Sequence, residues 1–339
     1  MAVTKIIGQQ VEVALSKETT RGTNEVPASG EWIERGSLKI TPNKEAGYIE
    51  ASNGLITTRK DQRSVGFNTE IVLSVNPSRA LMPKVLDAMF GDATPQVDTP
   101  ESGVDTFTFE ILNTNPRLAP TYTISIIEGA NQEYYAMGLL TKATMKFNAK
   151  EIPTLELTFM AKKRASTSGL TASYPTANSY FASTDVAIKM GEEYADLATA
   201  YALDVIEASL EFTRDFVASQ YLGSDTFTDI SATGWDIKTH IVKDHETLGL
   251  ASGDDQEAVD LFEDNTTVSL GIYVEDTATT MGASTNPSFE IEIPAGKVNG
   301  YDISTELKEL VGDEFDIEPI GADATNGFAI AECVSDSGL

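Results

Sequence analysis

Short stretches of alternating apolar and polar residues recur along most of the chain, bounded by Gly, Asn, Pro and Asp. Between Thr154 and Met160, for example, Leu155, Leu157 and Phe159 alternate with threonine and glutamate. Successive side chains of a strand point to opposite faces, so this period of two predicts half-buried strands in an antiparallel β protein. The segments predicted in this way are 37–41, 66–75, 106–112, 121–128, 141–148, 154–162, 203–215, 235–242, 267–275, 288–293, 299–307, 315–320 and 327–333.

Two helices interrupt the strands. Asn76-Pro77-Ser78 supplies a capping residue and an early proline, an apolar stripe runs from Leu81 to Met89 at helical spacing, and Gly91 ends the pattern. A second, shorter helix is predicted over 254–262, where acidic residues favour a helix start.

The remaining local signals are turns and a linker. Asn53-Gly54, Asn299-Gly300 and Asn326-Gly327 are candidate hairpin turns because both residue types tolerate positive φ. Residues 165–180 are small and polar, which is typical of a linker. This linker predicts a first β domain over 1–168 and a second over 181–339.

The two halves resemble each other in order and pattern. The segment 64–71, Ser-Val-Gly-Phe-Asn-Thr-Glu-Ile, matches 232–239, Ala-Thr-Gly-Trp-Asp-Ile-Lys-Thr, in character, and a predicted helix follows each segment. We interpret this as an internal duplication, although chance similarity between two β domains gives the same appearance.

Charge is distributed unevenly between the halves. The net charge is −28, and residues 1–169 contribute 18 basic and 19 acidic side chains, so nearly all the excess lies beyond residue 169. Such a chain is not expected to bind duplex DNA through counterion release. The acidity favours solubility of an abundant protein and leaves a high-salt habitat as an alternative.

Candidate chemistry is sparse. The sequence has no phosphate-binding glycine loop, no nucleophile elbow and no His-Glu-x-x-His motif. His240 and His245 are too far apart for one helical face, so a solvated loop is the better interpretation than a metal site. Cys333, the only cysteine, is expected to be a small buried side chain. We therefore predict no catalytic residue, no cofactor and no metal.

A long polar segment, 41–58, precedes the basic run Arg59-Lys60-Asp61-Gln62-Arg63. Nucleic-acid contact is possible for a basic run, but the interleaved aromatic residues of a single-strand binding surface are missing. We interpret 41–63 as a mobile loop that docks on an acidic neighbour, because the second half supplies such a partner.

Several segments together carry a family resemblance. They are 38–41, the return at 59–63, Gly66-Phe67-Asn68-Thr69-Glu70, the helix ending at Phe90-Gly91, 138–145, 153–159, 203–214 and 233–241. In this order they resemble the tail tube proteins of long-tailed viruses, over essentially the whole chain. The strongly acidic second half departs from that pattern.

The resemblance implies a mainly β fold class. It consists of tandem β-sandwich or half-barrel domains, each with a flanking helix, that complete a β-barrel ring by oligomerisation. It implies a virion protein of the tail, assembled in the host cytoplasm, whose rings of three duplicated or six unduplicated subunits stack into a tube. The implied partners are copies of itself, tape-measure and tail-end proteins, and viral DNA that passes through the lumen; no membrane is involved. Expected contact residues between subunits or rings are Tyr48, Ile49, Leu55, Arg59, Lys60 and Arg63.

Two other functions, a binding module and an enzyme, fit the sequence less well. An extracellular adhesin or carbohydrate-binding sandwich predicts a signal peptide, disulfides or exposed aromatic clusters, yet the start lacks an apolar leader and only 2 tryptophans occur. An enzyme on a β scaffold has only its abundant carboxylates in favour. No apolar run reaches the ~18 residues of a membrane span.

Overall fold

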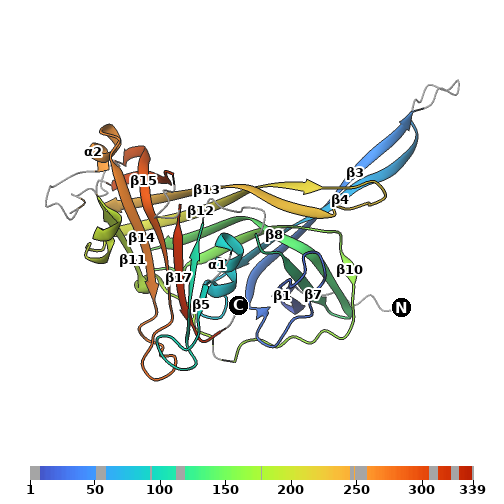
Figure 1. The fold of residues 1–339 in the computed structure, drawn as a ribbon, viewed down its shortest axis with the longest axis horizontal. Helices are drawn as coiled ribbons and strands as arrows, with labels where there is room; N and C mark the ends of the chain where they lie inside the picture. Colours follow the sequence, from blue (N-terminus) through green and yellow to red (C-terminus); the bar gives the residue numbers. More distant parts are fainter. Residues whose placement is uncertain are drawn as a thin grey trace.

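The computed structural model of the chain consists mainly of antiparallel strands (Figure 1). It describes residues 8–50, 59–91, 94–111, 119–176, 178–244, 248, 258–304, 312–321 and 328–337, and at 9, 49, 50, 59–62, 64 and 304 only the backbone. The strands up to residue 166 are β1 (Val11–Lys17), β2 (Trp32–Ile33), β3 (Arg35–Glu50), β4 (Arg59–Val75), β5 (Thr94–Gln96), β6 (Asp105–Glu110), β7 (Tyr122–Glu128), β8 (Asn131–Asn148), β9 (Thr154–Ala161) and β10 (Ala165–Ser166).

The later strands are β11 (Val186–Gly191), β12 (Val205–Ser219), β13 (Asp229–Asp244), β14 (Thr267–Glu275), β15 (Ser288–Ser304), β16 (Gly312–Pro319) and β17 (Ile330–Ser335). The helices are α1 (Met82–Phe90) and α2 (Ala258–Glu263), with 3₁₀ turns η1 (Gly8–Gln10), η3 (Ser183–Asp185) and η4 (Tyr194–Ala198). Neither α1 nor α2 has the length and apolar character needed to cross a membrane.

One main sheet runs through both halves in the order β3-β4-β9-β8-β12-β13-β16-β15. β15 also pairs with β14 and β17, which lead to β11 and β6. A smaller layer, β2-β1-β7-β8-β10, shares the first part of β8. The long strand β8 therefore belongs to both layers and links them.

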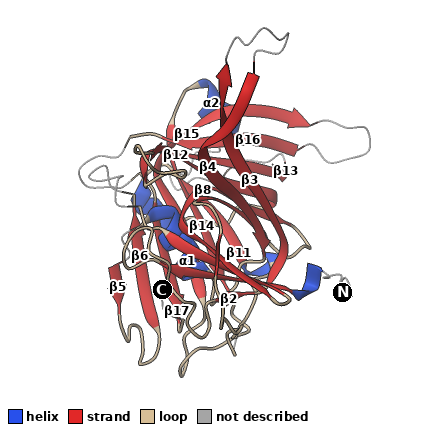
Figure 2. Ribbon diagram, turned by 90° about the vertical axis from the view of Figure 1, so that its right-hand side faces the viewer, coloured by secondary structure: helices blue, strands red, loops and turns tan. Residues whose placement is uncertain are grey.

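The apolar face of the main sheet packs on a continuous core. Leu73, Leu157, Ala143, Phe212 and Ile237 lie side by side in successive ladders, and all are buried. Helix α1 contacts β6, β8 and β17, and all of its residues are buried (Figure 2). Its apolar stripe thus meets strands on several sides, which explains the burial of so short a helix.

Two long hairpins, β3–β4 and β12–β13, extend from this core, and β3–β4 reaches beyond the rest of the molecule (Figure 1). The hairpins touch where the β12–β13 loop crosses β4. There Gln220 Nε2 donates to the Val65 carbonyl at 2.6 Å and Thr226 Oγ1 to the Phe67 carbonyl at 2.9 Å. The loop therefore holds the base of the projecting hairpin in a defined direction.

The antiparallel, mainly β prediction is confirmed, and the predicted strand 267–275 coincides with β14. The interpretation of 41–63 as a loop is wrong for its described parts, because 41–50 and 59–63 continue β3 and β4. Alternation is weak there since both faces are polar, so the periodicity signal fails. The turn predicted at Asn299-Gly300 is also wrong: Asn299 forms a bulge within β15.

Other expectations differ in detail. α1 begins at Met82 and its N-cap, Leu81, forms no side-chain cap, so Asn76 does not cap the helix. Pro83 lies in the first turn, as predicted. His240 lies in β13 and not in a loop, whereas Cys333 is buried in β17 as predicted. Leu55, His245 and the turns at Asn53-Gly54 and Asn326-Gly327 lie outside the described residues.

Candidate assembly surface

The strand ladders of the first half recur in the second. β8 pairs with β9 and skips Thr141 in a bulge, while β15 pairs with β16 and skips Asn299 at the same place in the ladder. Leu140 opposite Phe159 thus corresponds to Val298 opposite Ile317. Continuing along both ladders, Met145 corresponds to Ile303.

The two hairpins correspond in the same way. The β3–β4 ladder has bulges at Gly36 and Val65, and the β12–β13 ladder has bulges at Ile206 and Thr233 in equivalent positions. The ladders place Phe67 in the position of Trp235. The sequence comparison of 64–71 with 232–239 aligns the same two residues. On this basis Ile40 corresponds to Leu210, and Lys44 to Arg214. The recurrence supports a duplicated chain, while the domain boundaries at 168 and 181 stay a prediction.

The two repeats are joined inside the chain by pairing of β8 with β12. Met145 lies opposite Leu210 and Ala143 opposite Phe212, and all four side chains are buried. Phe212 also lies against Phe90 of α1, with ring centroids 6.2 Å apart. This internal joint therefore buries apolar side chains from both strands beneath the helix.

Arg214 closes the same joint electrostatically. Its guanidinium donates to the carbonyls of Ala88 (3.0 Å) and Met89 at the C-terminal end of α1, and to the carbonyl of Leu140 (3.3 Å) in β8. Burial lowers the pKa of Arg214 to about 10, and nearby Tyr122 and Asp87 oppose this shift. A cation at the negative end of a helix dipole is favourable, so Arg214 fastens β12 to α1.

The two outer margins of the main sheet have no strand beside them within the described part of the chain. β3 pairs with β4 alone, and residues 300–304 of β15 pair with β16 alone. Unpaired strand margins present rows of backbone donors and acceptors that attract further strands. These two margins, the β3 edge and the β15 edge, form the candidate assembly surface.

Side chains that are covered at the internal joint have uncovered counterparts at both margins. Leu210 is 2% exposed, while Ile40 at the β3 edge is half-buried. Met145 is 1% exposed, while Ile303 at the β15 edge is 48% exposed. Phe262 of α2, 42% exposed, stacks on Tyr301 beside Ile303. The margins thus carry apolar side chains that one more strand would cover.

The two margins also differ in charge. The β3 edge carries Arg35, Lys39 and Lys44 together with Glu45 and Glu50, whereas only acidic residues, Asp302, Glu263 and Asp264, are charged at residues 300–304 of β15 and at the end of α2. The β15 edge is therefore more acidic than the β3 edge, and this difference favours head-to-tail contact between copies.

The second face of the main sheet is polar. Lys142 pairs with Glu211 at 2.8 Å, Lys238 with Asp316 at 2.6 Å, and His240 Nδ1 lies 2.9 Å from Asp316. Although burial raises the pKa of Asp316, hydrogen bonds from Lys238 and His240 outweigh it and lower the pKa overall. The acidic side chains of this face include Glu70, Glu156, Glu207, Glu211, Asp215, Asp236, Asp244, Asp302, Glu314, Asp316 and Glu318, and its lysines include Lys39, Lys142, Lys146, Lys238 and Lys297.

The residues predicted as contacts share the projecting hairpin. Gly47 lies opposite Arg63, Ile49 opposite Asp61 and Glu50 opposite Arg59. Tyr48 is 48% exposed and lies opposite Gln62. Lys60 follows Arg59 on β4. These described residues therefore gather on one hairpin, and their role as contacts stays a prediction. Sequence reasoning did not identify the β3 edge or the β15 edge.

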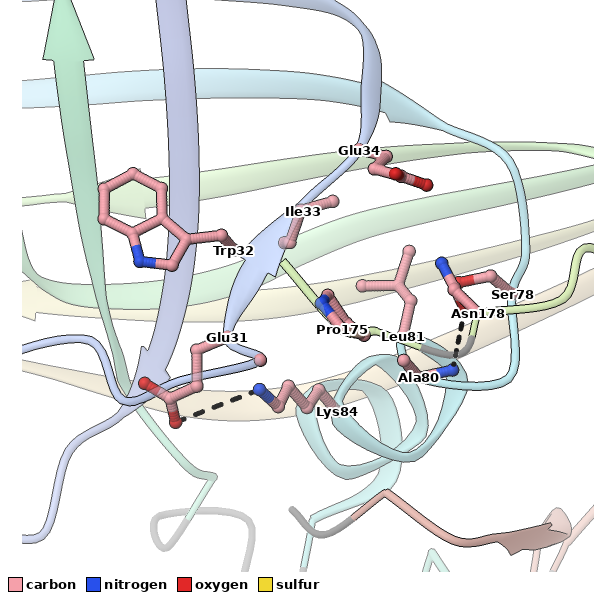
Figure 3. A pocket seen from close by; sticks show the side chains of 11 residues that line it. Glu31, Trp32, Ile33, Glu34, Ser78, Ala80, Leu81, Lys84, Pro175 and Asn178 are labelled. Atoms are coloured by element: carbon pink, nitrogen blue, oxygen red, sulfur yellow. Dashed lines mark hydrogen bonds and ion pairs between the residues drawn. The ribbon is translucent and has the colours of Figure 1, made fainter. Parts of the chain in front are cut away.

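The described chain also contains cavities. One between β2, α1 and residues 175–178 has about 20 Å³, room for about one water molecule (Figure 3). There the buried Lys84 lies 3.8 Å from Glu31, burial lowers its pKa, and Asn178 Oδ1 accepts from the Ala80 N–H at 3.3 Å. The second contact holds the predicted linker against the turn that precedes α1. Among the described residues, no group of three or more His, Cys, Asp or Glu is placed to hold a metal.

Fold and margins together define a β-rich protein whose main features are a continuous antiparallel sheet and its strand edges. A family model described as phage tail tube protein matches residues 8–324, nearly the whole chain. The chain therefore belongs to the phage tail tube protein family, a structural family of the virion tail. No curated protein matches the chain.

Proposed function

We propose that copies of this chain join the β3 edge of one to the β15 edge of the next, close into a ring, and stack as rings into the hollow tube of a viral tail. The observation that carries this proposal is the internal β8–β12 joint, which solves the same edge-pairing problem within one chain. Closing a sheet into a barrel removes every edge, so a ring satisfies both margins at once.

The ring contains three copies. Each chain supplies two equivalent sets of strands, β3-β4-β9-β8 and β12-β13-β16-β15, so three chains supply six sets. A ring of six chains would supply twelve sets around the hole.

The polar face of the main sheet lines the lumen, and the core face carries the helices outside it. Acidic groups outnumber lysines on the polar face. Phosphate binding needs cations, so DNA slides through such a lumen without being retained. The protein has a structural role and forms the wall of the tube without catalysis.

The β3–β4 hairpin makes the contact between rings. It extends beyond the body in Figure 1, and Tyr48, Ile49, Arg59, Lys60 and Arg63 lie in its two strands. Leu55 is added to these contacts from the sequence alone. Basic side chains there suit an acidic second half on the neighbouring ring. The tube ends meet tape-measure and tail-end proteins, and assembly takes place in the host cytoplasm.

Negative-stain electron microscopy of the purified protein over a range of salt and concentration tests this function. Rings or hollow tubes are expected. Monomers under every condition tested would contradict the proposal.

A further inference from the structure

We propose that β15 of one copy and β3 of the next pair in the register of the internal joint, with Ile40 opposite Ile303 and Thr41 opposite Asp302. This inference rests on the proposed function and adds which residues meet. The occupant of each margin is a second copy of this chain.

The register follows from the ladder equivalences. In the internal joint Met145 lies opposite Leu210, and Thr144 opposite Glu211. Met145 corresponds to Ile303 on β15, and Leu210 corresponds to Ile40 on β3. Transferring the joint to the margins places Ile303 opposite Ile40. The neighbouring pair Thr144–Glu211 becomes Asp302–Thr41 on the polar face.

The apolar side chains fit this register. Leu210 and Met145 bury each other at the joint, whereas Ile303 is 48% exposed until a neighbour covers it. Pro42 takes the place of Phe212 and so faces Tyr301, the half-buried counterpart of Ala143, on which the 42% exposed Phe262 stacks. At the internal joint the large Phe212 lies opposite the small Ala143. Between copies the smaller Pro42 would lie opposite the larger Tyr301 and the Phe262 ring stacked on it, so the two arrangements fill a similar space.

Pro42 also agrees with an edge location. Proline has no N–H and is found in sheets at edge strands, so the joint between copies loses at most one ladder hydrogen bond there. A slip of one residue would turn Ile40 and Pro42 to the polar face, so the apolar face fixes the register against such slips.

Charge fits the same register. Lys44 takes the position of Arg214, which binds the C-terminal end of α1. In the neighbouring copy that position faces the C-terminal end of α2, where Glu263 and Asp264 are exposed. The helix dipole and both carboxylates favour a cation at this point.

A hollow at the β3 edge agrees as well. At the internal joint a space of about 280 Å³ beside Val205 and Ala208 is bounded by the end of β8, from Phe147 to Lys150. The equivalent space beside Arg35 and Leu38 is about 910 Å³. The β3 edge thus has more open space than the internal joint, as expected where a neighbouring copy docks.

Disulfide trapping tests the register. Thr41→Cys with Asp302→Cys places two cysteines directly opposite, with Cβ atoms about 5 Å apart, on the solvent side of the sheet. β4, β9, β8, β12, β13 and β16 separate β3 from β15 in one chain, so a bond can form only between copies. The native Cys333 is buried and gives no background. The matched control is Asn43→Cys with Asp302→Cys, a two-residue slip.

Each variant is first imaged under reducing conditions to establish that rings form. Oxidation is expected to convert the T41C/D302C rings to covalent species larger than one chain on a non-reducing gel, and to leave the slipped control as single chains. Rings that cross-link only in the slipped control, or in neither variant, overturn the register while leaving ring assembly intact. Absence of rings in the unmodified protein and in both variants overturns the proposed function itself.

Discussion

Leu210 of β12 lies directly opposite Met145 of β8, and the two side chains are 2% and 1% exposed. This pair lies at the centre of the internal joint, where β8 of the first repeat pairs with β12 of the second. The counterparts of these residues lie on opposite margins of the same molecule, where Ile40 is half-buried and Ile303 is 48% exposed. One chain therefore contains a paired β8–β12 joint and also the two strand edges, β3 and β15, that could form an equivalent joint with neighbouring copies.

Replacing Arg214 is expected to destabilise the monomer. Arg214→Ala leaves the carbonyls of Ala88, Met89 and Leu140 without their buried donor, at a cost of about 3 kcal/mol in the free energy of unfolding. Urea unfolding of dilute, unassembled protein measures this cost.

Lys44→Ala is the matched variant at the equivalent position. Lys44 is exposed in the single chain, so the free energy of unfolding should change by less than about 0.5 kcal/mol. Ring formation should instead need a higher protein concentration, as sedimentation velocity would record. Equal destabilisation of the monomer by both variants would argue against the equivalence of these two residues.

A charge at Ile303 is expected to block assembly without unfolding the chain. Ile303→Asp places a carboxylate at the centre of the β15 edge, where a neighbouring β3 would desolvate it. Light scattering after size exclusion should show monomers at concentrations at which the unmodified protein forms rings. Val97→Asp, at a 66% exposed position beside β5, should leave the rings unchanged. Normal rings from the Ile303 variant would show that β15 is not in the interface.

Reversing the charge at the end of the projecting hairpin should separate ring formation from stacking. Arg59→Glu, Lys60→Glu and Arg63→Glu in one chain oppose the acidic second half of the adjacent ring. Isolated rings in place of tubes are expected in electron micrographs, with unchanged circular dichroism. Tubes of normal length from this triple variant would remove the hairpin from the stacking contact.

Stability is expected to fall between pH 5 and pH 8 because of Glu290. Burial, with repulsion from Glu292 and Glu332, raises its pKa to about 7, while Lys189 opposes the shift. A raised carboxyl pKa gives a stabilising contribution that is complete below the unfolded value near 4.5 and is lost as the pH rises through about 7. After allowance for partial exposure, Glu290→Gln should stabilise the protein by about 1 kcal/mol at pH 8.

Thermal unfolding at both pH values measures the difference. Glu101 supplies the control because hydrogen bonds from the Ser284 N–H, the Thr285 side chain and the Ala283 N–H lower its pKa to about 2. A lowered pKa contributes above the unfolded value and is lost only as the pH falls towards about 2, so Glu101→Gln should leave the change between pH 5 and pH 8 as it is. The same pH dependence in E290Q and the unmodified protein would show that another group controls it.

Sequence reasoning identified the β class because Leu155, Leu157 and Phe159 must alternate to bury one face of β9. It also aligned Phe67 with Trp235, the correspondence that the ladders give. It failed where polar residues occupy both faces, as at 41–50, because the long hairpin is held by backbone pairing that leaves no hydrophobic period.

The margins escaped prediction for a different physical reason. Ile40 and Ile303 look like ordinary core positions in an alternating strand, and only the order of strands in the sheet makes them edge residues. Sheet order depends on long-range pairing that a local pattern does not contain. The bulges at Thr141 and Asn299 are likewise determined by the ladder, and the Asn299-Gly300 sequence suggested a turn instead.

A cryo-electron microscopy map of the assembled particle tests the central claim most directly. The account predicts three chains around an open hole, each with β3 hydrogen-bonded to β15 of its neighbour and the polar face of the main sheet turned inward. A map in which β3 and residues 300–304 of β15 face solvent, with contacts made elsewhere, would contradict it.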